Sequence, residues 1–152
     1  MREREGGFTL IELMIVIAIL AVLVVIALPS FLAFRRTAQD RDAQATLVNA
    51  EKMMTVIGIE NEGMPGNAEL LTLLPDIDGT FTWTVTLDPS TSPRVVSIEE
   101  DEGTEVAMAV RSKSGRCFYL RVATTGPPVK HVAEPVASCV GVDFIDGAGS
   151  GW

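Results

Sequence analysis

Few side chains in this 152-residue sequence could do chemistry, and together they are not the set that an active site needs. They are one carboxylate inside a long apolar run, Glu12, one histidine, His131, and two cysteines, Cys117 and Cys139. No nucleophile motif, glycine-rich phosphate loop or acid pair in an identifiable cleft accompanies them. We therefore expect a protein that is not an enzyme and uses no cofactor or metal, with Glu12 as its most informative residue.

The residues around Glu12 form a long apolar run, which must be buried either in lipid or among other helices. Every residue from 13 to 28 is apolar, and with Phe8, Leu10 and Ile11 the run covers about 21 residues. A helix of that length, rising about 1.5 Å per residue, spans the ~30 Å hydrocarbon core of a bilayer. We expect a membrane-spanning helix, because so small a chain has little else with which to surround it.

A new amino terminus is the cation that could most readily reach Glu12. No lysine or arginine lies within the apolar run. Gly6-Gly7 offers an unhindered backbone to a peptidase, and cleavage after Gly7 leaves the α-amino group of Phe8 about one helical turn from Glu12. An uncleaved signal anchor, with Glu12 reaching the membrane surface, is the plainer alternative. A cleaved secretory signal fits less well, because no small-x-small site follows the run.

This segment resembles a known signal. The class III signal of type IV pilins and of type II secretion pseudopilins is similar to Gly6-Gly7-Phe8-Thr9-Leu10-Ile11-Glu12-Leu13, followed by an apolar helix with Pro29. The resemblance implies a membrane peptidase that removes residues 1–7 and methylates the amino group of Phe8. It also implies that Glu12, which lacks a counterion in a lone subunit, pairs with a neighbour's amino terminus, and that the helix loosens just ahead of Pro29.

The same resemblance implies a location and partners. The chain would be a single-pass precursor in the inner (cytoplasmic) membrane and then a subunit of an extracellular filament serving adhesion, motility, DNA uptake or surface sensing. Its partners would be copies of itself, the prepilin peptidase/methyltransferase, the pilus assembly platform and minor pilins. A net charge of −8 argues against direct binding to nucleic acid.

Two alternative functions remain. A type II secretion pseudopilin would share the N-terminal segment, although major pseudopilins carry an Asp-Pro-Trp-Gly segment where this chain has Asp88-Pro89-Ser90-Thr91. A membrane-anchored binding domain would need neither cleavage nor assembly.

The remaining sequence predicts one α+β domain. Beyond Pro29 the helix continues to near Glu60, because apolar residues recur at helical spacing at Ala43, Leu47, Ala50, Met54 and Ile57. Alternation from Thr80 to Leu87 predicts a strand, and residues 94–98, 105–112 and 116–123 predict three more. Their short links predict an antiparallel meander packed on the apolar face of the helix. We expect a leader at 1–7, a membrane and filament-core helix half at 8–34 and a pilin-like head at 35–152.

Shorter segments carry weaker patterns. Residues 68–74 predict one or two helical turns ended by Pro75, and residues 99–102 predict an acidic, solvated hairpin tip. Residues 129–132 and 140–145 predict short strands, and residues 147–152 predict a flexible tail.

Cys117 and Cys139 are too few for a structural zinc site, so they form either a disulfide or two buried thiols. Export would favour a disulfide, and closing a loop of about 22 residues would add roughly 3 kcal/mol to stability. The pilin resemblance favours it too, because many type IV pilins bound their C-terminal region with such a bond.

Overall fold

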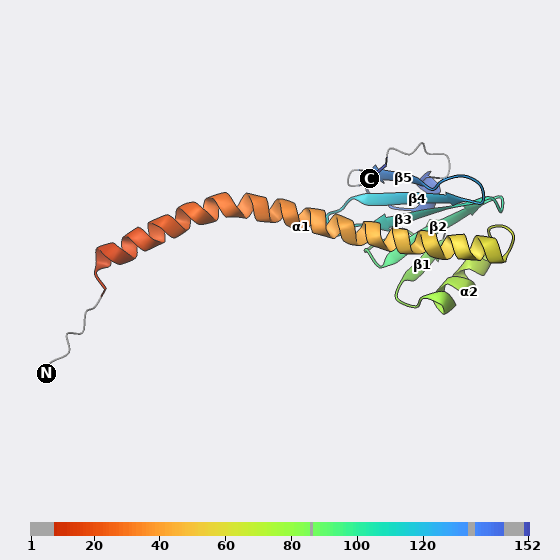
Figure 1. Cartoon of the computed structure of the whole chain (residues 1–152), viewed down its shortest axis with the longest axis horizontal. Coiled ribbons are helices and arrows are strands. Elements are labelled where there is room, and N and C mark those ends of the chain that lie inside the picture. The colour runs from red at the N-terminus through yellow and green to blue at the C-terminus, as the bar shows by residue number, and fades with distance from the viewer. Residues whose placement is uncertain (1–7, 86, 134–135, 145–150) are drawn as a thin grey trace. The chain divides into compact units, whose positions relative to one another are not determined.

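The computed structural model describes residues 8–85, 87–133, 136–144 and 151–152. Within them lie two α-helices, α1 (Leu10–Glu60) and α2 (Asn67–Ile77), and a 3₁₀ helix, η1 (Gly141–Phe144). The strands are β1 (Thr82–Val85), β2 (Val95–Asp101), β3 (Glu105–Arg111), β4 (Cys117–Ala123) and β5 (Val129–Ala133) (Figure 1). The chain divides into two compact units between Thr37 and Ala38.

The first unit contains the apolar half of α1. Each large apolar side chain from Leu10 to Leu28 is at least 51% exposed, so no part of the described chain covers it. The helix is unbroken at Pro29, where the resemblance implied loosening. α1 is the one described helix that is long and apolar enough to cross a membrane.

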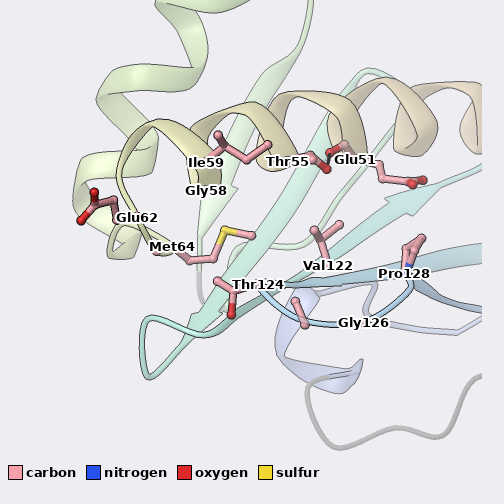
Figure 2. Close-up of a pocket in the computed structure, with 12 residues that line it drawn as sticks. Glu51, Thr55, Gly58, Ile59, Glu62, Met64, Val122, Thr124, Gly126 and Pro128 are labelled. Atoms are coloured by element: carbon pink, nitrogen blue, oxygen red, sulfur yellow. Dashed lines mark hydrogen bonds between the residues drawn. The ribbon is translucent and has the colours of Figure 1, made fainter.

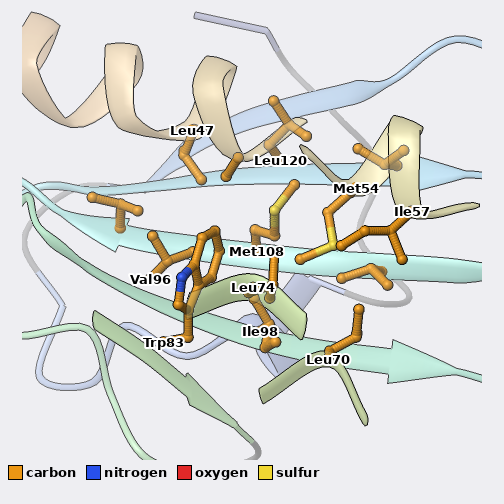
Figure 3. Close-up of a cluster of buried hydrophobic side chains, with 14 of the residues drawn as sticks. Leu47, Met54, Ile57, Leu70, Leu74, Trp83, Val96, Ile98, Met108 and Leu120 are labelled. Carbon is orange, nitrogen blue, oxygen red and sulfur yellow. The ribbon is translucent and has the colours of Figure 1, made fainter. Parts of the chain in front are cut away.

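The second unit packs the other half of α1 against the sheet. All five residues of the predicted apolar stripe, from Ala43 to Ile57, are at most 1% exposed, which confirms the helical periodicity. Figure 3 shows Leu47, Met54 and Ile57 over the core residues Met108 and Leu120 of the sheet. The expected α+β fold, a long helix on a largely antiparallel sheet, is confirmed.

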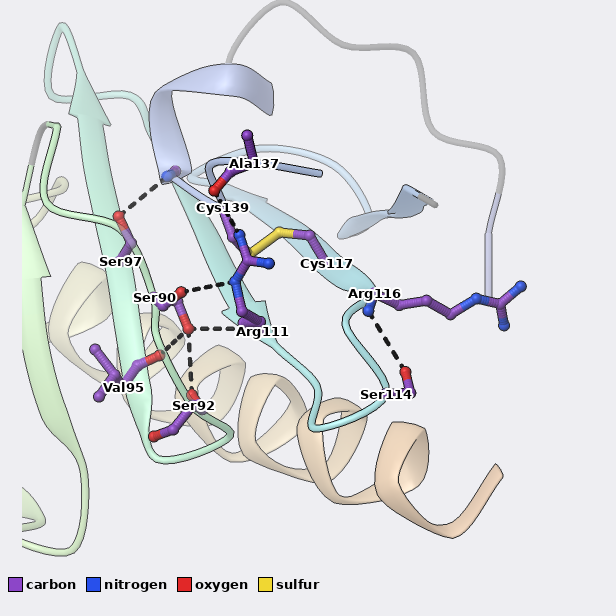
Figure 4. Close-up of a disulfide and its surroundings, with 11 residues drawn as sticks. Ser90, Ser92, Val95, Ser97, Arg111, Ser114, Arg116, Cys117, Ala137 and Cys139 are labelled. Carbon is purple, nitrogen blue, oxygen red and sulfur yellow. Dashed lines mark hydrogen bonds between the residues drawn. A yellow bond between two sulfur atoms is a disulfide. The ribbon is translucent and has the colours of Figure 1, made fainter. Parts of the chain in front are cut away.

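The sheet differs from the predicted meander at one edge. Its strand order is β1-β2-β3-β4-β5, and β2 to β5 are antiparallel neighbours, but β1 pairs with β2 in parallel. The link between them therefore returns along the sheet, and buried Ser90 holds it there. The Ser90 hydroxyl donates to the carbonyl of Val95 (2.5 Å) and accepts from the backbone N–H of Arg111 (2.8 Å) (Figure 4).

Several element boundaries differ from the predictions. α2 runs through Pro75, which does not stop the helix: the backbone N–H of Asp78 donates to the carbonyl of Leu74 (3.0 Å) and closes one further turn. Most of the acidic segment belongs to strand β2, and the turn consists of Glu102 and Gly103, both with positive φ. η1 replaces the strand expected at residues 140–145, of which residue 145 lies outside the described part.

The last residue is anchored, contrary to the flexible tail expected for 147–152. The indole N–H of Trp152 donates to the carbonyl of Tyr119 (3.2 Å), and its ring meets Phe118 edge to face. The ammonium of Lys130 lies 4.5 Å from the centre of the indole ring. Through these contacts Trp152 packs against residues of β4 and β5. Residues 147–150 lie outside the described residues.

Candidate functional site

The site that the sequence predicted lies at the start of α1. Thr9 immediately precedes the helix, and Glu12 lies in its first turn. One carboxylate oxygen of Glu12 accepts from the backbone N–H of Thr9 (2.9 Å) and from its hydroxyl (2.7 Å). The Thr9 hydroxyl in turn accepts from the backbone N–H of Glu12 (3.3 Å). This reciprocal arrangement is a capping box, which satisfies backbone donors that the first helical turn leaves unpaired.

The capping box refines the expected state of Glu12. Its carboxylate has hydrogen-bond donors within its own chain, but no ion pair joins it to any described cation. Hydrogen bonds reduce the cost of removing this group from water without neutralising its charge. Thr9 was not among the predicted functional residues, although the pattern Thr-x-x-Glu before an apolar run is typical of a capping box.

Of the other predicted processing residues, the structure describes Phe8 alone. Gly6 and Gly7 lie outside the described residues. Phe8 precedes the capping residue, outside the helix, and is 93% exposed. An amino group created at Phe8 would stand at the exposed beginning of α1, one residue before the Thr9 N–H that Glu12 binds.

A disulfide joins Cys117 of β4 to Cys139, whose Cα atoms are 5.7 Å apart (Figure 4). It fastens the segment ahead of η1 to the sheet face that points away from α1. Gly141 then lies so close to the strands that its backbone N–H donates to the buried hydroxyl of Ser97 (3.2 Å). The bond therefore stabilises the irregular C-terminal region of the second unit.

The single histidine packs among aromatic rings on the same face. The rings of His131 and Phe144 stack with centroids 5.5 Å apart, and Tyr119 lies 5.6 Å from Phe144. Burial raises the pKa of Tyr119 to about 12, and the nearby carboxylate of Asp143 contributes to the increase. The described residues contain no cluster of His, Cys, Asp or Glu that could hold a metal ion.

A polar lock joins α1 to the β3–β4 turn. Asp40, 9% exposed, accepts hydrogen bonds from the hydroxyls of Ser112 (2.7 Å) and Ser114. Its second oxygen lies 3.5 Å from a guanidinium nitrogen of Arg116. Because Ser112 is itself buried, the lock holds one turn of α1 to the sheet.

A pocket of about 530 Å³ lies between the last turns of α1 and the end of β4 (Figure 2). Its α1 side includes Glu51, Thr55 and Gly58, and its sheet side includes Val122 and Thr124. Glu51 and Glu62 are the charged residues among those that line it.

One family model and several known proteins match this chain. Residues 2–28 match the family model described as the prokaryotic N-terminal methylation motif. The chain is 43% identical over 65 residues to the type IV wide pilus major component of Thermus thermophilus, a match covering 43% of this chain and 50% of that protein. It is 32% identical over 65 residues to the type II secretion system core protein G of Dickeya chrysanthemi, covering 43% of this chain and 42% of that protein.

A competence protein of Halalkalibacterium halodurans supplies the broadest of these matches relative to its own length. It is 33% identical over 69 residues, which is 45% of this chain and 68% of that protein. The match to the Thermus pilus component, by contrast, covers only half of that protein's length. No solved structure matches the chain. The N-terminal motif, the helix-on-sheet fold and these relatives, which are structural subunits rather than enzymes, show that the chain belongs to the type IV pilin family.

Proposed function

We propose that this protein is the subunit of a type IV pilus, which polymerises through α1 into an extracellular filament. The observation that carries the proposal is an apolar helix whose large side chains are at least 51% exposed from Leu10 to Leu28, with one carboxylate in its first turn. Such a surface must be covered by lipid before assembly and by other copies of the helix afterwards. Two Thermus thermophilus relatives are named as major components of a wide and a narrow pilus.

Maturation would supply the cation that Glu12 lacks. In this proposal a prepilin peptidase removes residues 1–7 and methylates the amino group of Phe8 in the inner membrane. That amino group then pairs with Glu12 of a neighbouring subunit as the assembly platform adds subunits to the filament. The pairing is favourable because both charges lie in a medium of low dielectric, where an unpaired carboxylate is costly. Residues 8–34 would form the filament core and residues 35–152 the head.

Two substitutions in the capping box test the charge of Glu12 separately from its hydrogen bonds to Thr9. Glu12→Gln keeps an oxygen that can accept from Thr9 but removes the negative charge. Thr9→Val removes the hydroxyl but keeps the charge. If pairing with an amino terminus drives assembly, Glu12→Gln should be processed and inserted normally yet yield at least about ten-fold fewer sheared filaments, as one lost buried ion pair predicts. Thr9→Val should retain most filaments.

Mass spectrometry of the mature amino terminus tests the first step. A chain that begins at methylated Phe8 supports the proposal, and an intact Met1 supports the membrane-anchored binding domain instead. Wild-type quantities of sheared filament from Glu12→Gln would contradict the proposed role of the charge.

The secretion pseudopilin is the second candidate, favoured by the match to a type II secretion core protein. Cells that lack this protein separate the two functions. Loss of surface fibres seen by electron microscopy supports the pilus subunit, whereas intact fibres with a loss of protein secretion support the pseudopilin.

A further inference from the structure

In the second unit, the residues of α1 directly opposite its buried stripe include no acidic residue, although the chain has a net charge of −8. In the second unit this side consists of residues that recur every three or four positions, here called the outer stripe: Arg41, Ala45, Val48, Lys52, Val56 and Ile59. With 3.6 residues per turn, they lie opposite the buried stripe. Val56 is 50% exposed and Ile59 75%. Neither Arg41 nor Lys52 forms an ion pair with a described residue.

The pocket beside the last turns of α1 has the opposite charge. It is here called the acidic groove and is lined by Glu51, Thr55, Gly58, Glu62 and the end of β4, with no basic residue. Figure 2 shows Glu51 and Glu62 toward opposite ends of this groove. A smaller pocket of about 340 Å³ on the other side of α1 contains Arg94 as well as Asp42 and so lacks this single sign of charge.

The two surfaces match in spacing. Arg41 and Lys52 are eleven residues apart within α1, which is close to three helical turns, or about 16 Å. Glu51 and Glu62 are also eleven residues apart, with Glu62 in the turn just beyond the end of α1. If two copies of α1 lie parallel and are displaced by ten residues, or about 15 Å, Arg41 of one copy is level with Glu51 of the other. Lys52 then lies level with the turn that follows α1 of the other copy and contains Glu62.

We propose that the outer stripe of one subunit docks along the acidic groove of a second copy, with Arg41 beside Glu51 and Lys52 beside Glu62 of that copy. This contact rests on the proposed filament, because membrane insertion in one direction makes the helices of all subunits parallel. The stripe and the groove occupy different sides of one helix, so each subunit offers both. Such a heterologous contact repeats without closing and extends a fibre.

Charge reversal in the full-length chain tests the pairing. Arg41→Glu with Lys52→Glu should lower the sheared filament mass about five-fold relative to the membrane-inserted pool, as should Glu51→Lys with Glu62→Lys. All four changes together should restore the filament mass. A matched control, Arg94→Glu with Lys113→Glu, makes the same charge change at exposed positions off the stripe and should leave the filament mass unchanged.

Each result either supports or overturns the proposed pairing of the outer stripe with the acidic groove. Wild-type filament mass from either reversal, or no recovery when the reversals are combined, overturns the pairing. Neither result touches the proposed function, which depends on Glu12→Gln. If that variant alone assembles normally, the proposed function fails while the reversals still report on the stripe.

Cross-linking measures the same contact without relying on filament yield. Lys52→Cys with Glu62→Cys places both partner positions on each chain. Lys52 lies about 12 Å along α1 from its last residue, Glu60, and Glu62 lies in the turn beyond that end, so the two cysteines are too far apart to bridge internally. Oxidation of membranes should produce a ladder of dimers, trimers and larger species. Either cysteine alone should remain monomeric, and the native disulfide is too buried to exchange. A monomer from the double variant, or dimers from the single variants, overturns the proposal.

Discussion

Replacing Gly141 with alanine tests how closely η1 packs on the sheet. A Cβ at this position would lie 2.7 Å from the carbonyl oxygen of Ala107 and 2.9 Å from the backbone nitrogen of Glu99. Both atoms belong to the paired strands β2 and β3, so they cannot move aside as the tip of a flexible side chain can. The φ angle of Gly141 is not in the left-handed region, and the cost of the substitution is therefore steric.

The magnitude follows from two opposing effects. Forcing an extra methyl group into a packed site costs about 1–3 kcal/mol. Replacing glycine also restricts the unfolded chain, which returns about 0.4–1 kcal/mol to the folded state. The net loss is about 1–2 kcal/mol. With a urea slope of about 1.5 kcal/mol per molar for a unit of this size, the unfolding midpoint should fall by about 1 M.

The assay is urea unfolding of the full chain in detergent with the disulfide intact. Fluorescence of buried Trp83 and docked Trp152 reports the transition. Gly79→Ala is the matched control, because its Cβ would meet no described atom closer than the Pro75 carbonyl at 3.7 Å. The control should unfold at or slightly above the wild-type midpoint. Equal midpoints for Gly141→Ala and the wild type would refute the close packing of η1.

Three further predictions concern the second unit. Cys117→Ser with Cys139→Ser should lower the free energy of unfolding by roughly 3 kcal/mol in urea, because it opens a loop of about 22 residues; unchanged stability would contradict a structural role. Asp40→Ala should cost about 2–3 kcal/mol in the same assay, since it leaves the buried Ser112 hydroxyl and the partly buried Ser114 hydroxyl without this acceptor, whereas Asp40→Asn should cost less. Tyr119 is the single tyrosine, and absorbance should show it ionising near pH 12. Because folding raises its pKa, its contribution to stability is present below about pH 10 and lost as the pH rises toward 12; Asp143→Asn should lower that midpoint, and a midpoint near 10 in the folded protein would refute the burial effect.

Some of the candidate site could be predicted because its determinants are neighbours in sequence. Glu12, Phe8 and the apolar run define a short segment whose chemistry does not depend on distant residues. The capping role of Thr9 is equally local, and its three-residue spacing from Glu12 was present in the sequence. The buried stripe from Ala43 to Ile57 was predictable for the same reason, since helical periodicity alone decides which side chains share a face.

The sequence by itself therefore determined the long apolar helix, the carboxylate at its start, the buried face of α1 and most of the strands. Tertiary structure alone decided the parallel pairing of β1 with β2, the Asp40–Ser112 lock and the docking of Trp152. These features join segments that no local period relates, 72 residues apart in the lock. The partner of such a segment depends on which arrangement buries the most apolar surface while satisfying every buried polar group, and that balance belongs to the whole fold.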